Sequence, residues 1–200
     1  QPEVDGNKLG VYGHSMGGKL TVLTAGSDKR VRAAAPSCGG ISDRYSANPL
    51  HLATVSDPPS LKEITCPIIF LSPSNDFHGR INDLETSIRE IKSKDWRVTC
   101  SPHHNHQDTP EYEVATQLWF DQHLKNSFRF PKTPELKLLL PAGKSPMVTV
   151  DVDDTREIAA IDVFYTQQAQ TDGKRDNSSN TKNRFWQHSA VSKNGGKWTA

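Results

Sequence analysis

The feature that most constrains this chain is the stretch KLGVYGHSMGGKL at residues 8–20, which places a serine between two glycines. An apolar run at residues 9–12 predicts a short β-strand before the serine, and the pattern after residue 18 is helical. A G-x-S-x-G turn between a strand and a helix lifts the serine hydroxyl out of the edge of a sheet. We therefore predict a strand–turn–helix unit with Ser15 at the turn.

The two glycines follow from the geometry of such a turn. Gly13 and Gly17 stand two positions on either side of Ser15, where we expect a side chain to collide with the neighbouring strand or helix. The same turn aims the backbone N–H of Met16 at the place where a reacting carbonyl oxygen becomes negative. Ser15 is thus a candidate nucleophile and Met16 a candidate oxyanion donor. The alternative is a glycine-rich turn with an incidental serine.

From residue 8 to about 126, short apolar runs alternate with helical patterns, which favours an α/β fold with a parallel sheet. One helix is predicted at residues 81–91, and Thr109–Pro110 predicts the start of another, with Val114, Leu118 and Trp119 facing inward. Residues 36–63 show no periodicity and are predicted to form a long loop beside the serine. The strands are expected at residues 9–12, 31–35, 67–71 and 97–101, the third of them covered on both faces.

The pattern changes after residue 126. Residues 127–133 have the prolines and polar side chains of a linker, and from about residue 134 apolar and polar residues alternate in short runs such as MVTVDVD. Short strands at this spacing predict a small all-β sandwich domain. We therefore predict a first domain at 1–126, a linker at 127–133 and a second domain at 134–200.

A serine hydroxyl needs a base to take its proton and an acid to orient that base. In a fold of this type both partners follow the serine in the order acid, then histidine, each in a loop after a strand. Asp76 stands in that place after the apolar strand, whereas Asp83 lies within the next helical pattern and is expected to be a solvated surface charge. A turn or capping role is the alternative for Asp76.

Three histidines compete for the role of the base in the run PHHNHQDTP. We favour His106, because it lies nearest to the final helix; His104 is its closest rival, followed by His103. The run also contains His104-x-His106-x-Asp108, the spacing of a metal-binding loop. No further histidine cluster completes such a site and Asp108 is better explained by the helix start, so we predict no metal.

The segments VYGHSMGG, PIIFLSPSNDFHG and SPHHNHQDTPEYEVATQLWFDQHL together resemble the C-terminal half of an α/β-hydrolase, of the dienelactone-hydrolase-like and prolyl-oligopeptidase-like type. The resemblance covers roughly residues 4–126. It implies a Ser15–Asp76–His106 triad and a fold whose N-terminal strands are missing from this chain, so that the missing N-terminal part of the same enzyme is an expected partner. An Ig-like β domain is expected to follow.

The resemblance implies hydrolysis of a small carboxylic ester through an acyl-enzyme, without metal or organic cofactor. One alternative is a peptidase of the prolyl-oligopeptidase type. Another is a non-catalytic binding protein whose β domain presents aromatic side chains to a sugar, although such side chains are more often core. His78 and His104 are candidate substrate contacts, with a purely structural loop role as the alternative for His78. Cys38 is a weak rival nucleophile, because no base is placed for it.

Composition argues against some classes of partner. The 200 residues carry 24 basic and 23 acidic side chains, for a formal net charge of +1. Neither a nucleic acid nor an anionic membrane is therefore favoured. No apolar run approaches the roughly 20 residues of a membrane-spanning helix. The three cysteines are widely spaced and include no CxxC pair, which predicts neither a zinc site nor a disulfide framework.

Overall fold

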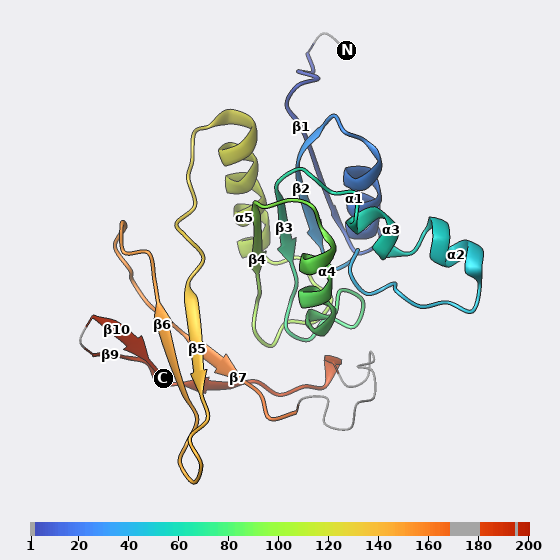
Figure 1. Cartoon of the computed structure of the whole chain (residues 1–200). Helices are drawn as coiled ribbons and strands as arrows, with labels where there is room; N and C mark the ends of the chain where they lie inside the picture. The colour runs from blue at the N-terminus through green and yellow to red at the C-terminus, as the bar shows by residue number, and fades with distance from the viewer. Residues whose placement is uncertain (1–2, 169–180, 195) are drawn as a thin grey trace. The chain divides into compact units, whose positions relative to one another are not determined.

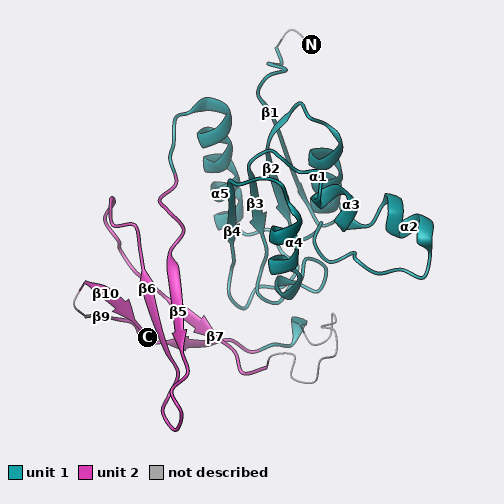
Figure 2. Cartoon of the chain, in the orientation of Figure 1, with its two compact units in different colours: residues 1–129, 170–184 teal, residues 130–169, 185–200 magenta. Residues whose placement is uncertain are grey.

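The computed structural model describes residues 3–168, 181–194 and 196–200. The chain forms two compact units, coloured separately in Figure 2. Unit 1 comprises residues 1–129 and 170–184, and unit 2 comprises residues 130–169 and 185–200. The predicted domain borders at 126 and 134 stay predictions, and residues 181–184 group with the first unit although they lie far beyond both borders.

Unit 1 contains a sheet of four parallel strands in the order β1-β2-β3-β4, with helices between them (Figure 1). The predicted α/β class is confirmed, and each strand lies within two residues of its expected bounds. The elements in chain order are β1 (Leu9–His14), α1 (Met16–Ser27), β2 (Val31–Ser37), α2 (Pro49–Thr54), α3 (Asp57–Leu61), β3 (Ile68–Leu71), the 3₁₀ turn η1 (Ile81–Asp83), α4 (Leu84–Glu90), β4 (Trp96–Thr99), α5 (Pro110–Phe120) and the π-helical turn η2 (Asp121–Lys125).

Strand β3 is buried along its whole length, as its apolar sequence predicts. Ile68 and Phe70 belong to a core cluster that includes Val22 of α1 and Leu84 of α4. Ile69 and Leu71 point to the opposite face, because side chains alternate along a strand. Burying one such side chain contributes roughly 1.5–3 kcal/mol. This two-sided core holds the strand ends that carry the functional loops.

The helix predicted at residues 81–91 is present as η1 and α4, and its apolar stripe packs on the core. Helix α5 begins at Pro110 after Thr109, as predicted. The prediction for Val114 is wrong: its side chain is 55% exposed, whereas Tyr112 and Trp119 are fully buried. The two large aromatic rings set the inward stripe, and Val114 lies about 200° around the helix from Tyr112. No helix in the described ranges combines the length and apolar character that spanning a bilayer requires.

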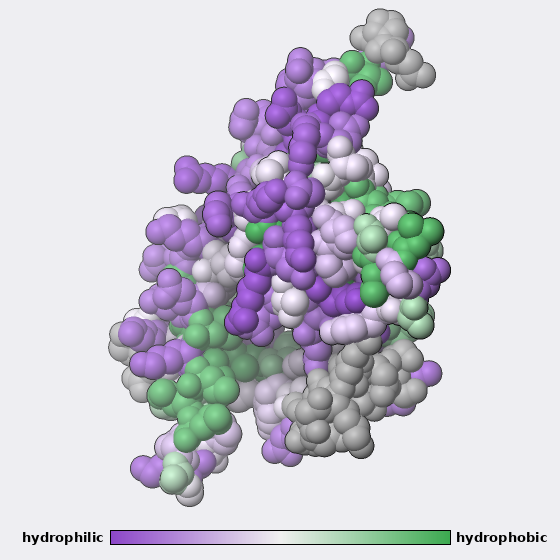
Figure 3. Space-filling view, turned by 45° about the vertical axis from the view of Figure 1, so that its right-hand side comes forward, coloured by the Kyte–Doolittle hydropathy of each residue, from purple (hydrophilic) through white to green (hydrophobic). Residues whose placement is uncertain are grey.

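The segment expected to be a long loop at residues 36–63 instead contains two short helices, α2 and α3. Asn48 caps α2, because its side-chain oxygen accepts a hydrogen bond from Leu50 N at 2.9 Å, and Pro49 occupies the first helical position. The two helices have 6 and 5 residues, which is too short to produce a hydrophobic periodicity in the sequence. Leu50 is 69% exposed, and Figure 3 shows apolar surface in this region of unit 1.

A cluster of charges is buried between α1 and the segment that follows β2. Lys19 of α1 is 7% exposed and its ammonium group contacts Asp43. Asp57 is 1% exposed, and its Oδ2 accepts a hydrogen bond from Asp43 N at 2.8 Å. Burial raises the pKa of Asp57 to about 6, although the Asp43 N–H and the Lys19 charge act in the opposite direction. The cluster fixes the course of the chain beyond β2.

Unit 2 consists of short antiparallel strands (Figure 1). One sheet has the order β5-β6-β10-β9, and a second pairs β7 with β8. The predicted all-β character is present, whereas the face-to-face packing of a sandwich and the Ig-like topology stay predictions. The strands are β5 (Glu135–Leu139), β6 (Met147–Asp151), β7 (Val163–Tyr165), β8 (Gln187–Ser189), β9 (Ser192–Asn194) and β10 (Lys197–Thr199).

Candidate active site

The predicted strand–turn–helix unit is present at residues 9–27. Ser15 lies between the end of β1 and the start of α1, with φ 61° and ψ −118°. A positive φ is uncommon for a residue with a side chain, and such strained backbone is concentrated at functional turns. The turn is held by Ser15 N, which donates to Ser37 O at 2.9 Å.

The structure requires glycine at position 13 of this turn, as predicted, but not at position 17. A Cβ at Gly13 would lie 2.4 Å from Gly17 O, which is impossible without moving the backbone. A Cβ at Gly17 would meet nothing within 4 Å, so the expected collision there is wrong. Gly18 takes that place, because its Cβ would lie 2.4 Å from Ser37 O on the neighbouring strand β2.

The structure brings together the three side chains that the sequence singled out. His106 Nε2 lies 2.7 Å from Ser15 Oγ, and His106 Nδ1 lies 3.0 Å from Asp76 Oδ1. A carboxylate only accepts hydrogen bonds, so Nδ1 carries the proton and Nε2 is left to accept from the serine hydroxyl. The two hydrogen bonds form a continuous chain from a buried carboxylate to Ser15.

Asp76 is fully buried and its Oδ1 is held from several sides. Besides His106, this oxygen accepts hydrogen bonds from His78 N at 2.7 Å and from Gly79 N at 3.1 Å. Oδ2 has no hydrogen-bond partner among the described residues. The orientation of the His106 ring therefore depends on its hydrogen bond to Oδ1, and a small rotation of the carboxylate would break that hydrogen bond.

The three histidines of the base loop differ in their surroundings. His103 and His104 are exposed, and His104 Nδ1 lies 3.2 Å from Gln107 Oε1. Only His106 is within hydrogen-bond distance of Ser15. His78 lies close by: its ring Nδ1 contacts Cys38 O at 2.9 Å and its ring stands edge-on to that of His106 at 5.6 Å. The contact with the Cys38 backbone agrees with the alternative of a structural loop role for His78, whereas substrate contact by His78 and His104 stays a prediction.

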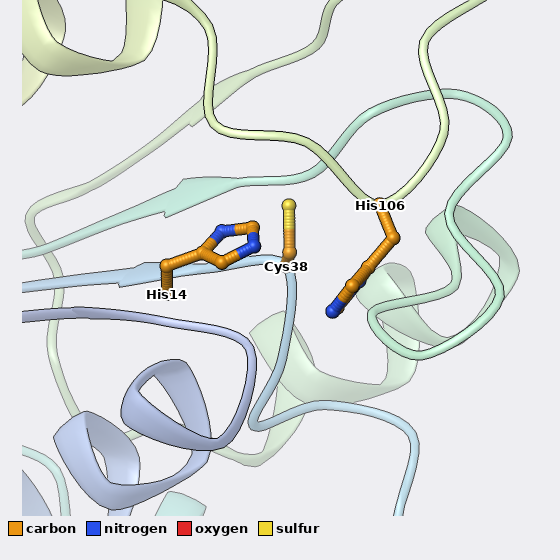
Figure 4. Close-up of side chains that lie close together, drawn as sticks. All are labelled: His14, Cys38 and His106. Atoms are coloured by element: carbon orange, nitrogen blue, oxygen red, sulfur yellow. The ribbon is translucent and has the colours of Figure 1, made fainter.

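Cys38 lies between the rings of His14 and His106 in the view of Figure 4, and donor atoms of the three residues lie within 4.8 Å of one another. Cys38 is fully buried, and burial together with the negative charges of Asp76 and Asp108 raises the pKa of its thiol far above the ordinary range. A thiol in this state is a poor nucleophile. The alternative metal loop of His104, His106 and Asp108 is not among the groups of potential ligands in the described residues, because neither His104 nor Asp108 joins His14, Cys38 and His106.

Asp108 has a role that the sequence did not indicate. It was expected to belong to the start of α5, but its carboxylate faces the sheet instead. Oδ1 accepts a hydrogen bond from Ser37 Oγ at 2.6 Å, and Oδ2 accepts one from Tyr12 Oη. Burial and the Asp108 charge raise the pKa of the Tyr12 hydroxyl. The polar residues at the ends of β1 and β2 were the available signal, since strand ends of a parallel sheet meet at one edge.

Comparisons with known proteins agree with this fold. The model of the Dienelactone hydrolase family matches residues 1–111. Two similar solved structures are an acetyl xylan esterase from Paenibacillus sp. R4 (18% identity, TM-score 0.52, covering 62% of this chain and 48% of that one) and an acylaminoacyl peptidase from Pyrococcus horikoshii (15%, TM-score 0.51, 62% and 25%).

A third is acetyl xylan esterase 1 from Thermoanaerobacterium sp. JW/SL YS485, with 17% identity and a TM-score of 0.50, covering 61% of this chain and 47% of that one. The chain thus spans about half the length of these esterases and a quarter of the peptidase. A comparison with curated proteins finds no significant match. The structural neighbours establish the α/β-hydrolase fold, and the family match covers more than half of the 200 residues. The chain belongs to the dienelactone hydrolase family.

Proposed function

We propose that this chain carries the reaction centre of a serine hydrolase that cleaves carboxylic esters through an acyl-enzyme. The observation that supports the proposal best is the continuous pair of hydrogen bonds from Ser15 through His106 to the buried Asp76. A glycine-rich turn with an incidental serine has no reason to present its hydroxyl to a histidine that a buried carboxylate orients. The family match supports a hydrolase.

The proposed mechanism begins at Ser15. His106 Nε2 takes the hydroxyl proton while Oγ forms a bond to the ester carbonyl carbon, and the carbonyl oxygen becomes an oxyanion. Met16 N, the first backbone N–H of α1, is the proposed donor to that oxyanion. The tetrahedral intermediate then collapses, the C–O bond to the alcohol breaks, and the alcohol leaves with the proton from His106.

Deacylation repeats the same steps with water. His106 takes a proton from a water molecule, the water oxygen attacks the acyl carbon, and Ser15 Oγ leaves with the proton as the acid is released. Asp76 stays ionised throughout and stabilises the protonated imidazole. None of these steps requires a metal or an organic cofactor. We propose a small carboxylic ester as the substrate.

A fluorophosphonate probe, which reacts covalently with activated serines, tests the proposal on the complete protein. We expect stoichiometric labelling that the Ser15→Ala variant loses, whereas the exposed-site control Ser27→Ala keeps it. Full labelling of Ser15→Ala would overturn the proposal, because the activated serine would then lie elsewhere. No labelling of the parent would overturn it in favour of a non-catalytic binding protein. Faster cleavage of a nitroanilide amide than of the matching nitrophenyl ester would favour the peptidase alternative.

A further inference from the structure

Residues 181–184, here termed the clamp segment, contact the loop that carries Asp76. The segment lies far beyond residue 111, where the family match ends. Thr181 is fully buried and Arg184 is 5% exposed, although both side chains are polar. A buried guanidinium is costly unless its hydrogen bonds are met, so its position in the fold is strongly specified.

Asn75, the residue before Asp76, forms the main contact with the clamp segment. Its side chain is 5% exposed, and Nδ2 donates to Arg184 O at 2.5 Å and to Lys182 O at 3.4 Å. Backbone carbonyls only accept hydrogen bonds, which identifies this end of the amide as the NH₂ group. The two donors of the amide therefore both serve the clamp segment.

The other end of Asn75 connects to the base loop. Asn75 Oδ1 accepts from Ser74 Oγ at 2.7 Å, and Ser74 Oγ in turn accepts from His103 N at 2.9 Å. The backbone adds two more links, from Asn75 N to His104 O at 3.0 Å and from Ser74 N to Ser101 O at 3.1 Å. One hydrogen-bond network thus joins the clamp segment to the loops of both Asp76 and His106.

The clamp segment also contacts the far end of the acid loop. Arg184 Nη1 donates to Asn82 Oδ1 at 3.0 Å, and Asn82 lies in η1, after Asp76 and His78. The loop between Asn75 and Asn82 is therefore held at both ends by one short segment. That loop supplies Asp76 Oδ1, which alone of the two carboxylate oxygens contacts His106.

We propose that the clamp segment is a positioning element that keeps the Asp76 carboxylate aligned with His106. The proposal rests on the proposed function, since it concerns the efficiency of the same triad. Misplacing a catalytic group by about 1 Å can lower a rate by roughly 10²-fold. An element outside the family-matched residues then contributes to catalysis without touching substrate.

The test uses variants at both contacts in the complete protein, with a nitrophenyl ester as substrate. Asn75→Asp keeps the size of the side chain but presents an oxygen to the two clamp carbonyls. We expect kcat to fall about 10- to 100-fold with KM within about twofold. The acidic limb of the kcat/KM profile against pH, on which the general base loses its proton, should shift. Asn183→Ala, an exposed position in the same segment, serves as the matched control and retains the parent values.

A second pair of variants keeps the proposal falsifiable if Asn75→Asp does not fold. Asn82 is exposed, so Asn82→Ala is expected to fold and to lower kcat about 3- to 10-fold. Asn82→Asp keeps an acceptor for Arg184 and is expected to restore the parent kcat. If folded Asn75→Asp, or Asn82→Ala, has the kcat and pH profile of the parent, the proposal that the clamp segment positions Asp76 is wrong.

The fluorophosphonate probe separates this outcome from failure of the proposed function. If the clamp acts as proposed, the clamp variants still label to full stoichiometry at Ser15, but more slowly. If the parent protein does not label at all, the proposed function fails. A lower melting temperature with unchanged kcat and pH profile would show that the segment only stabilises the fold.

Discussion

Asp76 Oδ1 lies 3.0 Å from His106 Nδ1, and the carboxylate that holds it is completely buried. Two backbone N–H groups, from His78 and Gly79, hold the same oxygen. The acid is therefore fixed by the chain next to it, and the orientation of the imidazole depends on a single oxygen atom. A substitution that changes this oxygen should therefore lower activity, and the loss can be measured separately from any effect on folding.

Replacing Asp76 by Asn is expected to lower kcat by about 10³- to 10⁴-fold, because the amide favours the wrong tautomer of His106. KM should change little, since Asp76 is buried and does not reach the substrate. Steady-state kinetics with a nitrophenyl ester measure both constants. Asp83→Asn is the matched control, because Asp83 of η1 pairs with Arg80 and not with His106, and this variant should leave kcat within about twofold. Equal losses in both variants would contradict the assignment of the acid.

The assignment of the base is tested by a pair of histidine variants. His106→Ala should reduce kcat by several orders of magnitude, because Ser15 then has no proton acceptor. His104→Ala should keep kcat within about threefold, since the His104 ring is exposed and faces Gln107. A rise in KM in His104→Ala would support its proposed contact with substrate. If His104→Ala proves the severe variant, the base has been misassigned.

Activity is expected to survive incubation with EDTA, because the proposed mechanism uses His106 as the general base and no proposed step uses a metal. The assay compares initial rates before and after dialysis against the chelator. Loss of activity on chelation together with recovery on adding Zn²⁺ would contradict the serine mechanism and favour a metallohydrolase.

Stability should depend on pH through Asp57. Burial raises its pKa from the usual value of 3.8 to about 6, so the folded state holds this proton more tightly than the unfolded state does. The resulting stability is present in full below about pH 4 and is lost as the pH rises through about 6. Between pH 4 and 7.5 the free energy of unfolding should therefore fall by about 1–3 kcal/mol less in Asp57→Asn than in the parent. Urea unfolding at a series of pH values measures this difference, and parallel curves would contradict it.

Two glycine variants distinguish the turn geometry from the sequence motif. Gly13→Ala should prevent correct folding, because its Cβ would lie 2.4 Å from Gly17 O. Gly17→Ala should fold with a melting temperature near that of the parent, since nothing lies within 4 Å of the added atom. Circular dichroism and thermal melts compare the two. Similar destabilisation by both variants would show that the motif, as expected from sequence, requires both glycines.

The amino-acid sequence by itself determined the features that depend on neighbouring residues. The apolar run before Ser15 and the glycines around it specify the strand, the turn and the helix, because strand and helix periods and glycine requirements are local. The apolar run at β3 predicted a strand covered on both faces, and Thr109–Pro110 predicted a helix start. The order of Ser15, Asp76 and a histidine followed from loops at the ends of three of the parallel strands, β1, β3 and β4.

Only the tertiary structure decided which groups meet across those loops. Choosing His106 over His104, pairing Asp108 with Ser37, and burying Lys19 beside Asp43 all depend on contacts between segments far apart in the chain. Side-chain direction in a loop has no period, so sequence spacing carries no information about it. The inward stripe of α5 also differs from the prediction, because burial of Tyr112 and Trp119 depends on the sheet against which the helix packs. The clamp segment is the extreme case, since a polar run beyond residue 180 shows no local sign of contacting Asn75.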